Sequence, residues 1–243
     1  MLTFRFLGTG NAFGAGGRRQ SCYLIETDKI ILLDAGYATL SALRSVSLDI
    51  SQIDAILISH VHPDHYMGLP QFVLEDYYVI KRETSIPVFG PIGLKDKLTE
   101  ITAVMYNQEV ADHLTELYDI LEYGPNETFD FLNGNVQTLD ADHTGNAQMQ
   151  IITINGNTIG YTGDTALMPS NLTKLLECDL VISEASSFSN SIPHHTTVEE
   201  LQNFANPQGK TIYLTHVGES VLQNIPNIKP PLVLASDGLI VYL

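Results

Sequence analysis

Three histidines and one aspartate, His60, His62, Asp64 and His65, lie within one short segment of the chain. Imidazole nitrogens and carboxylate oxygens are the ligands that borderline divalent metals such as zinc prefer. Residues two apart in an extended backbone point to the same side, and Pro63 favours that conformation at the residue before it. Asp64 and His65 follow the proline and face another direction. The segment can therefore supply two ligands to each of two neighbouring metal positions.

A metal needs more ligands than this segment supplies, and three later segments each offer one. His143, Asp164 and His216 each follow a β-like run and enter a turn with glycine or asparagine close by. Loops at strand ends are held rigidly by the sheet and are a common place for binding sites. We therefore expect these three side chains to complete the metal site.

The order and spacing of these residues resemble the metallo-β-lactamase superfamily, and the matching motifs extend over nearly the whole chain. The resemblance implies an α/β fold, an αββα sandwich of two packed mixed sheets with helices outside. It also implies a dinuclear site for two divalent metal ions, with zinc favoured and manganese or iron as alternatives. The implied ligands are His60, His62 and His143 for the first ion and Asp64, His65 and His216 for the second, with Asp164 bridging the two.

An earlier carboxylate, Asp34, also fits the superfamily pattern, as it follows the apolar run that ends at Leu33. We interpret it as a residue that orients one of the ligand histidines rather than as a ligand itself. The alternative is a turn residue that makes only local hydrogen bonds.

The glycine-rich segment 8–17 does not predict a nucleotide-binding loop. It has no Gly-Lys-Ser/Thr ending, its glycine spacing does not fit the dinucleotide fingerprint, and a strand rather than a helix follows. We expect a tight loop beside the site. Arg18 and Arg19 end this loop, and two interpretations stay open: one of them contacts an anionic substrate, or both are solvated charges.

The chemistry that such a site supports is hydrolysis. Two adjacent cations lower the pKa of a shared water, which makes hydroxide available at pH 7. They also attract a phosphoryl or carbonyl oxygen and stabilise the charge that builds on it. Asp64 is the best-placed general base, and no Ser-His-Asp or Cys-His arrangement is evident in the sequence.

A second group of residues bears on the substrate class. Glu184 ends a strand-like run, and His195 lies downstream in the segment 193–197. These segments are similar to the Glu-Ala-Thr and His-Ser-Thr segments of the ribonuclease Z branch and related phosphodiesterases. The resemblance implies that His195 assists catalysis at the phosphate and that Glu184 orients it, as in the usual general-acid arrangement. The alternative is a histidine at the start of a helix; the adjacent His194 receives no role.

Segment 88–94 resembles the same branch, but the chain is shorter than typical ribonuclease Z proteins. It has no Gly/Lys-rich insertion for a tRNA-gripping arm, and its net charge of −16 argues against a long nucleic acid as partner. A small anionic substrate, a cyclic or linear phosphodiester, fits better. The alternatives are a hydrolase of a lactone, thioester or β-lactam, and a non-enzymatic metal-binding or redox module.

Length and composition indicate one globular domain over residues 1–243, with 44% hydrophobic residues. No apolar run is long enough to cross a membrane, and the N-terminus lacks the features of a signal peptide. Cys22 and Cys178 form no metal-type or redox pair, so a cytoplasmic location is expected. A homodimer is compatible with the sequence.

Strand-like runs alternate with helical candidates along the whole chain, which indicates an α/β domain. His113 lies on a helical face and is expected to be structural, and Thr197 begins the last helix like a capping box. The expected strands are 2–7, 21–26, 29–33, 53–59, 127–132, 147–153, 158–162, 179–183, 211–215 and 238–242. The expected helices are 38–47, 68–79, 92–105, 109–118, 169–177 and 197–206.

Overall fold

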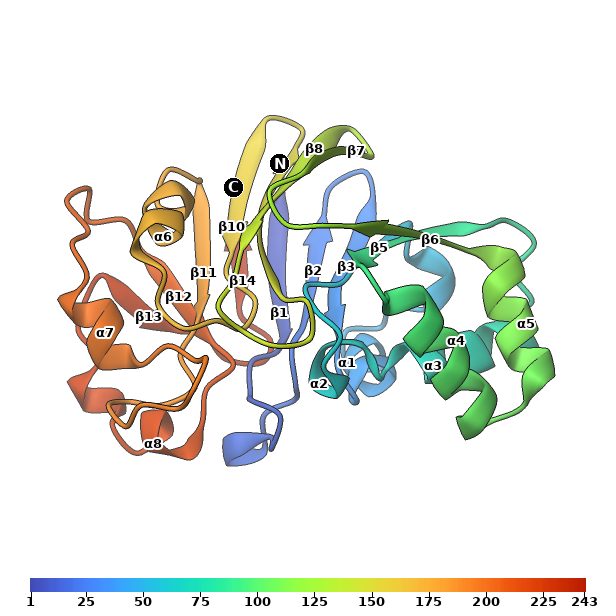
Figure 1. Cartoon of the computed structure of the whole chain (residues 1–243), viewed down its shortest axis with the longest axis horizontal. Coiled ribbons are helices and arrows are strands. Elements are labelled where there is room, and N and C mark those ends of the chain that lie inside the picture. Colours follow the sequence, from blue (N-terminus) through green and yellow to red (C-terminus); the bar gives the residue numbers. More distant parts are fainter.

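The computed structural model describes residues 1–243 and contains two seven-stranded sheets packed face to face. Helices cover the outer face of each sheet, so that one group lies on either side of the molecule (Figure 1). This arrangement confirms the expected αββα sandwich of two mixed sheets. None of the helices combines the length and the apolar character that crossing a membrane requires.

The first sheet has the strand order β14-β1-β2-β3-β4-β5-β6. Its strands pair antiparallel from β14 to β3 and parallel from β3 to β6. Their bounds are β1 (Thr3–Gly8), β2 (Cys22–Glu26), β3 (Ile30–Ala35), β4 (Ala55–Leu57), β5 (Ile86–Pro91), β6 (Tyr118–Tyr123) and β14 (Ile240–Tyr242).

The second sheet has the order β13-β12-β11-β10-β9-β8-β7 and repeats this plan. Its strands pair antiparallel from β7 to β10 and parallel from β10 to β13. Their bounds are β7 (Thr128–Phe131), β8 (Gly134–Asp140), β9 (Gln148–Ile154), β10 (Asn157–Tyr161), β11 (Leu180–Glu184), β12 (Ile212–Thr215) and β13 (Leu232–Leu234).

The first sheet carries the helices α1 to α5, and the second carries α6 to α8. The expected capping box at Thr197 is confirmed, since its hydroxyl accepts a hydrogen bond from the Glu200 amide at the start of α7. The helices are α1 (Thr39–Ser45), α2 (Pro63–Tyr66), α3 (Leu69–Glu75), α4 (Leu94–Met105), α5 (Gln108–Leu117), α6 (Pro169–Leu175), α7 (Val198–Asn203) and α8 (Glu219–Leu222), with shorter turns at Ala15–Gly17, Ile50–Gln52, Asp76–Ile80 and Ile225–Asn227.

The hydrophobic core has three layers because side chains alternate along each strand. In β3, Ile31 and Leu33 lie between the two sheets together with Tyr161 of β10. Leu32 points the other way and lies in a second cluster with Phe72 of α3. A third cluster lies under α6 and α7 on the far sheet. Burial on both faces fixes the register of the central strands, and with it the position of the residues that follow them.

Several short elements were not expected from the sequence: β5, β6, β8, β13, α2 and α8. In β5, Pro87 and Pro91 argue against a strand inside a sheet, because proline cannot donate a ladder hydrogen bond. The structure accommodates them because β4 pairs with β5 only at Val88 and Phe89. Both prolines therefore lie outside the pairing with β4, although they lie within the longer pairing with β6, opposite Asp119 and Tyr123.

Candidate active site

The expected site residues meet at one edge of the sandwich, where the parallel strands end. Strands β3 and β4 of the first sheet and β10, β11 and β12 of the second each carry one of them at the strand end or shortly after it. Strand β8 runs in the same direction as β10, because both pair antiparallel with β9 between them. The residues carried at or just after these strand ends are Asp34, His60, His143, Asp164, Glu184 and His216.

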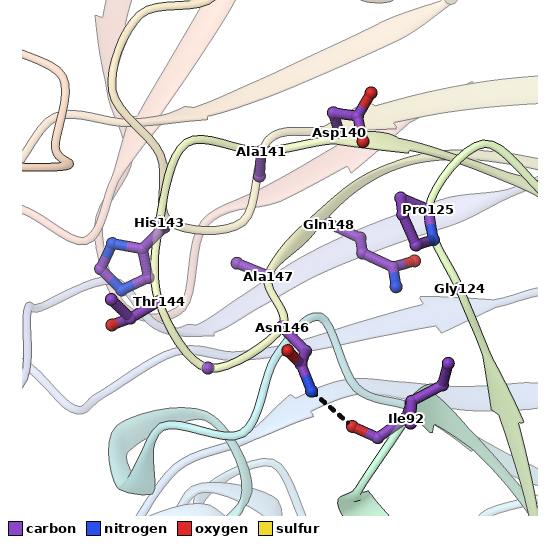
Figure 2. Close-up of a pocket in the computed structure, with 11 residues that line it drawn as sticks. Ile92, Gly124, Pro125, Asp140, Ala141, His143, Thr144, Asn146, Ala147 and Gln148 are labelled. Carbon is purple, nitrogen blue, oxygen red and sulfur yellow. Dashed lines mark hydrogen bonds between the residues drawn. The ribbon is translucent and has the colours of Figure 1, made fainter.

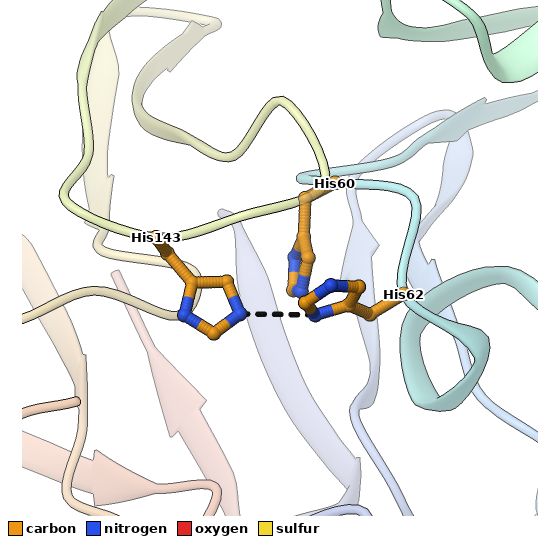
Figure 3. A group of neighbouring side chains, drawn as sticks. All are labelled: His60, His62 and His143. Atoms are coloured by element: carbon orange, nitrogen blue, oxygen red, sulfur yellow. Dashed lines mark hydrogen bonds between the residues drawn. The ribbon is translucent and has the colours of Figure 1, made fainter. Parts of the chain in front are cut away.

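One group consists of His60, His62 and His143, whose candidate ligand nitrogens all lie within 4.8 Å of one another (Figure 3). His62 has the extended backbone expected before Pro63, with φ −95° and ψ 146°. Its Nδ1 lies 2.9 Å from Nε2 of His143, which comes from the other sheet. The structure thus brings together the three residues expected for the first metal position.

A second group consists of Asp64, His65, Asp164 and His216, again within 4.8 Å. Asp64 and His65 were expected in a loop, facing another direction from His60 and His62, and they lie in the short helix α2, which begins at Pro63. Proline suits the first helical position because its fixed φ is helical and its missing N–H is not needed there. Nε2 of His216 lies 3.1 Å from Oδ2 of Asp64 and 3.2 Å from Oδ2 of Asp164.

Asp164 lies between the two groups. Its Oδ1 is 3.4 Å from Nε2 of His65, and its Oδ2 is 3.8 Å from Nε2 of His60. Gly163, which precedes it, has φ +55°, a conformation that glycine adopts without strain. The aspartate expected to bridge two metal ions therefore reaches residues of both groups.

Each imidazole in the two groups is held at the ring nitrogen that points away from the centre. Such contacts fix the orientation and the tautomer of a metal-binding histidine. The partners are Ser59 Oγ for His60 Nδ1 (3.1 Å), Thr144 Oγ1 for His62 Nε2 (3.0 Å), Asp34 Oδ2 for His65 Nδ1 (2.8 Å), the His194 carbonyl for His143 Nδ1 (2.9 Å) and Ser186 Oγ for His216 Nδ1 (3.0 Å).

The expected contact between Asp34 and a histidine of the site is confirmed. The carboxylate of Asp34 is fully buried and also accepts hydrogen bonds from the amide and hydroxyl of Ser59 and from the Tyr161 hydroxyl. Its φ of +53° is unusual for a residue other than glycine, although aspartate and asparagine tolerate it better than most. Four donors therefore hold a residue whose backbone is itself constrained.

Three buried atoms at the centre, Nε2 of His60, Nε2 of His65 and Oδ1 of Asp164, make no hydrogen bond within the chain. Buried polar atoms are nearly always paired, because losing water without a new partner costs free energy. Divalent cations at the two positions would satisfy all three, and nitrogen and oxygen donors of this kind suit zinc and related ions. The side chains thus fit a divalent-metal centre.

The carboxylates of this centre are held in their charged form. Burial alone would raise the pKa of Asp64 and of Asp164. The neighbouring imidazoles outweigh burial, chiefly His65 for Asp64 and His216 for Asp164, so both pKa values lie far below the ordinary range. Both carboxylates therefore offer negative oxygens at neutral pH.

The imidazoles divide into two kinds. Burial lowers the pKa of His143 to about 4 and that of His60 well below its ordinary value, so both are neutral at pH 7. Burial also acts to lower the pKa of His65 and of His216, but the surrounding carboxylates raise both above the ordinary value. A cation at the second position therefore competes with protons.

Glu184 and His195 form a pair beside this centre. Oε1 of the fully buried Glu184 lies 2.8 Å from Nδ1 of His195, and the same oxygen accepts the Thr165 amide at 2.7 Å. The His195 ring stacks on His216 with 5.6 Å between ring centroids. Burial acts to lower the pKa of His195, but the hydrogen bond and charge of Glu184 raise it above the ordinary value. The contact expected from the sequence is thus present.

His194, left without a role by the sequence, connects two loops of the site. Its carbonyl accepts the hydrogen bond from His143, and its own Nδ1 lies 2.8 Å from Oδ1 of Asp142. Its φ is +62°, so the backbone turns sharply between these contacts and His195. Only its position next to His195 could have indicated this role in the sequence.

Arg18 and Arg19 both bind within the chain. The Arg18 guanidinium donates to the Thr9 hydroxyl at 2.6 Å and to the Ala235 carbonyl at 2.5 Å. The Arg19 guanidinium donates to the Leu7 carbonyl at 3.2 Å. Neither is a freely solvated charge, and together they fasten the glycine-rich loop to neighbouring segments.

His113 lies on α5, and no group of candidate metal ligands includes it. Its ring packs against Tyr77 with 5.2 Å between centroids, and its Nε2 lies 3.8 Å from Oδ2 of the buried Asp76. These contacts agree with the structural role expected for it.

A pocket of about 410 Å³ adjoins the cluster, with His143 at one end of its lining (Figure 2). Its walls come mainly from the loop 140–148, with residues 124–125 and Ile92 opposite. The Asn146 amide donates to the Ile92 carbonyl at 2.7 Å and so connects the two walls. Of the residues grouped above, only His143 lines this pocket, so it lies beside the candidate metal centre rather than around it.

The chain is similar to known proteins over most of its length. A family model described as Anti-Pycsar protein Apyc1 matches residues 2–231. The Anti-Pycsar protein Apyc1 of Paenibacillus sp. (strain J14) is 25% identical over 228 residues, which cover 90% of this chain and 91% of that protein. A ribonuclease Z of Metallosphaera sedula is 37% identical over 102 residues, but these cover 41% of this chain and only 34% of the relative. The chain thus matches about a third of the length of that relative.

Solved structures show the same fold. The metallo-β-lactamase fold protein YhfI from Bacillus subtilis superposes with a TM-score of 0.80 at 20% identity, covering 100% of both chains. The short form of human tRNase Z, ELAC1, gives a TM-score of 0.77 at 23% identity, covering 99% of this chain and 98% of that one. The two sheets and their helices therefore have the metallo-β-lactamase arrangement.

Proposed function

The chain belongs to the Anti-Pycsar protein Apyc1 family, and we propose that it is a metal-dependent phosphodiesterase that hydrolyses a small phosphodiester. The observation that carries the proposal is the Glu184–His195 pair beside the cluster of histidines and aspartates. A histidine held by a carboxylate can protonate the alkoxide or phenoxide that leaves a phosphodiester. The relatives named as ribonuclease Z and tRNase Z support the same reaction class.

We propose that the site holds two divalent cations, with zinc favoured and manganese or iron as alternatives. Four groups of side chains have ligand atoms within 4.8 Å of one another, and the two described above share no residue, so each can hold a cation of its own. The unpaired buried atoms, which come from both of these groups, also support this number. The residues that would hold the first cation are His60, His62 and His143, and those for the second are Asp64, His65 and His216, with Asp164 shared.

Bound cations would supply Lewis-acid polarisation of a phosphoryl oxygen and a lowered pKa for water at the site. The chain supplies the rest. His195 donates from Nδ1 to Glu184, so Nε2 is the nitrogen that can hold a proton and release it to the leaving oxygen. The raised pKa of His195 keeps that proton available near neutral pH. Glu184, itself fixed by the Thr165 amide, orients the ring.

Asp64 is proposed both as a ligand and as the general base. Its carboxylate is nearly buried, and Oδ2 lies 3.1 Å from Nε2 of His216. The very low pKa of Asp64 makes its carboxylate a weak base, so its role as a ligand is the better supported of the two. An Asp64→Asn variant, which keeps one side-chain oxygen, would separate the two roles.

The substrate is proposed to be small and anionic. Twelve lysines and arginines against 28 aspartates and glutamates leave the chain too acidic for a long nucleic acid to be favoured. Hydrolysis of a lactone or thioester is not favoured, because the relatives that the chain matches are named as ribonuclease Z, tRNase Z and Anti-Pycsar protein Apyc1, which supports phosphodiester hydrolysis. A homodimer and a cytoplasmic location stay predictions.

The test is a hydrolysis screen of purified protein whose metal content has been measured. The panel should contain bis-aryl phosphates, cyclic nucleotides, cyclic sugar phosphates, lactones and a thioester. We expect turnover of at least one phosphodiester, lost on treatment with a chelator and restored by a divalent cation. Turnover confined to the lactones or the thioester would contradict the proposal.

A further inference from the structure

The hydroxyl of Ser186 lies where three functional groups of the site meet. Its Oγ is 2.7 Å from Oε2 of Glu184, 3.0 Å from Nδ1 of His195 and 3.0 Å from Nδ1 of His216. Ser186 is 5% exposed, so solvent does not compete freely for these contacts. A single buried hydroxyl therefore touches both halves of the site: a candidate metal ligand and the Glu184–His195 pair.

The numbers of donors and acceptors on these groups determine which atom donates each hydrogen bond. Both oxygens of Glu184 accept backbone amides, Oε1 from Thr165 at 2.7 Å and Oε2 from Ser186 at 3.2 Å. A carboxylate only accepts, so the one proton of the Ser186 hydroxyl is donated to Glu184. The lone pairs of Oγ then remain for the Nδ1–H of His216 and for the Nδ1–H of His195, which is shared with the closer Oε1 of Glu184.

This pattern sets the tautomer of His216. Because its Nδ1–H donates to Ser186, the neutral ring that binds a cation carries its lone pair on Nε2. That Nε2 lies 3.1 Å from Oδ2 of Asp64 and 3.2 Å from Oδ2 of Asp164, in the group proposed for the second cation. Removing the hydroxyl would leave a buried Nδ1–H of His216 without its partner and free the ring to turn.

The backbone around Ser186 holds the hydroxyl in place. The Ser186 amide also donates to the Thr196 carbonyl at 3.1 Å, and the Ala185 amide donates to the Thr215 carbonyl at 2.9 Å. These bonds join the segment after β11 to the residue that follows His195 and to the residue that precedes His216. The two histidines are thus tied to Ser186 through the main chain as well as through its side chain.

We propose that Ser186 is a positioning residue that couples the second cation to the general acid, by holding His216 and His195 with one hydroxyl. It does not touch the substrate. It acts by presenting Nε2 of His216 to the cation and by supporting Glu184 as the acceptor for His195. The part of this inference that concerns His195 rests on the proposed function. The part that concerns His216 rests on metal binding alone.

The test compares Ser186→Ala with Ser186→Thr, which keeps the hydroxyl, and with Ser183→Ala as the matched control. Ser183 is also buried, but its hydroxyl touches only the Glu184 carbonyl. One readout is cation affinity, measured by competition with a chromogenic chelator. The other is turnover of bis-phenyl phosphates bearing p-nitro, p-chloro or p-methoxy groups. In this order the leaving phenoxide becomes more basic, and its departure depends more on protonation.

In Ser186→Ala we expect the weaker-binding of the two cations to lose about 10- to 100-fold in affinity. We also expect turnover of the p-methoxy ester to fall roughly tenfold more than that of the p-nitro ester. Ser186→Thr and Ser183→Ala should stay close to wild type in both readouts. Unchanged affinity and unchanged leaving-group dependence in Ser186→Ala, or equal effects in Ser183→Ala, would overturn the proposal.

A substitute variant and a readout that needs no turnover allow the test to decide in two further cases. If Ser186→Ala loses its cooperative thermal transition, Ser186→Cys replaces it, because a thiol has a similar shape but hydrogen-bonds weakly. If the wild-type protein hydrolyses no phosphodiester, the proposed function fails. The affinity comparison then still decides the inference, because it needs no turnover.

Discussion

The carboxylate of Asp34 lies 2.8 Å from Nδ1 of His65, although the two residues are 31 positions apart in the chain. Asp34 belongs to β3 and His65 to α2, and the same carboxylate accepts a hydrogen bond from Tyr161 of the opposite sheet. One buried side chain thus connects both sheets to a candidate metal ligand. The connection between the two sheets and the orientation of His65 therefore depend on the same carboxylate.

Replacing Asp34 by asparagine should weaken cation binding without unfolding the protein. Asparagine tolerates the positive φ at this position but cannot provide the charge that orients His65. We expect a loss of about 10- to 100-fold in affinity for one cation, measured by chelator competition. Asp54→Asn is the control, because Asp54 pairs with Lys29 away from the site. Equal affinities in the two variants would contradict the role assigned to Asp34.

Replacing Asp164 by alanine should lower the bound metal well below two ions per chain. Asp164 lies close to both groups of side chains, 3.8 Å from Nε2 of His60 and 3.4 Å from Nε2 of His65. Its loss removes a shared negative oxygen and leaves the imidazoles of His60 and His65 facing each other. Elemental analysis of the dialysed protein gives the stoichiometry, and an unchanged value would refute the assignment. His60→Ala should lower it in the same way.

Replacing His195 by alanine should reduce turnover of an aryl phosphodiester by about 10²- to 10⁴-fold while metal content stays intact. His195 is placed as a proton donor to the leaving oxygen, not as a ligand in the two groups of metal-binding side chains. Glu184→Gln should act in the same direction, because an amide holds the imidazolium less strongly. His113→Ala is a control far from the site. Parallel loss of metal and turnover would show that His195 is a ligand or a structural residue.

At His194, cation affinity and turnover should depend on the backbone conformation rather than on the imidazole. The side-chain pair with Asp142 is about half exposed, at 52% and 55%, so it adds little stability. The carbonyl that accepts from His143 depends on φ +62°, which glycine adopts freely and a β-branched residue resists. His194→Gly should therefore keep cation affinity and most turnover, whereas His194→Val should lose both. The reverse order would contradict this explanation.

Asp179, which lies away from the site, should make the stability of the folded protein depend on pH. Its carboxylate accepts hydrogen bonds from the amide and hydroxyl of Thr158, which lower its pKa in the folded protein. A lowered folded-state pKa means that this stabilisation is present above the unfolded value, about 3.9, and is lost as the pH falls through the folded value. Asp179→Asn should thus lower the unfolding temperature at pH 7 and make less difference near pH 3. A difference that is constant with pH would contradict this.

Much of the site could be predicted from the sequence because its residues are concentrated and their context is simple. Four candidate ligands lie in one segment after β4, and the other three each follow an apolar strand. Strands that are buried on both faces fix their own direction and register, so the residues at their ends are brought to one edge. The unbroken apolar run around Leu32 likewise indicates a strand with two buried faces.

Other features depend on tertiary contacts that leave no local pattern. Strand β5 contains two prolines, which lie outside its short pairing with β4 but inside its longer pairing with β6, and no local pattern indicates this arrangement. The helix α2 spans only Pro63–Tyr66, too short for a periodic signal. Ser186 and His194 act through partners far along the chain, His216 and His143 respectively. Their spacing in the sequence carries no information about those partners.

The most direct test of the central claim is an anomalous-scattering crystal structure of the protein grown with zinc or manganese. The account predicts two peaks at the sheet edge, one among His60, His62 and His143 and the other among Asp64, His65 and His216. An oxygen of Asp164 should lie near both peaks. Absence of peaks at this edge, or ions bound only elsewhere on the chain, would contradict the account.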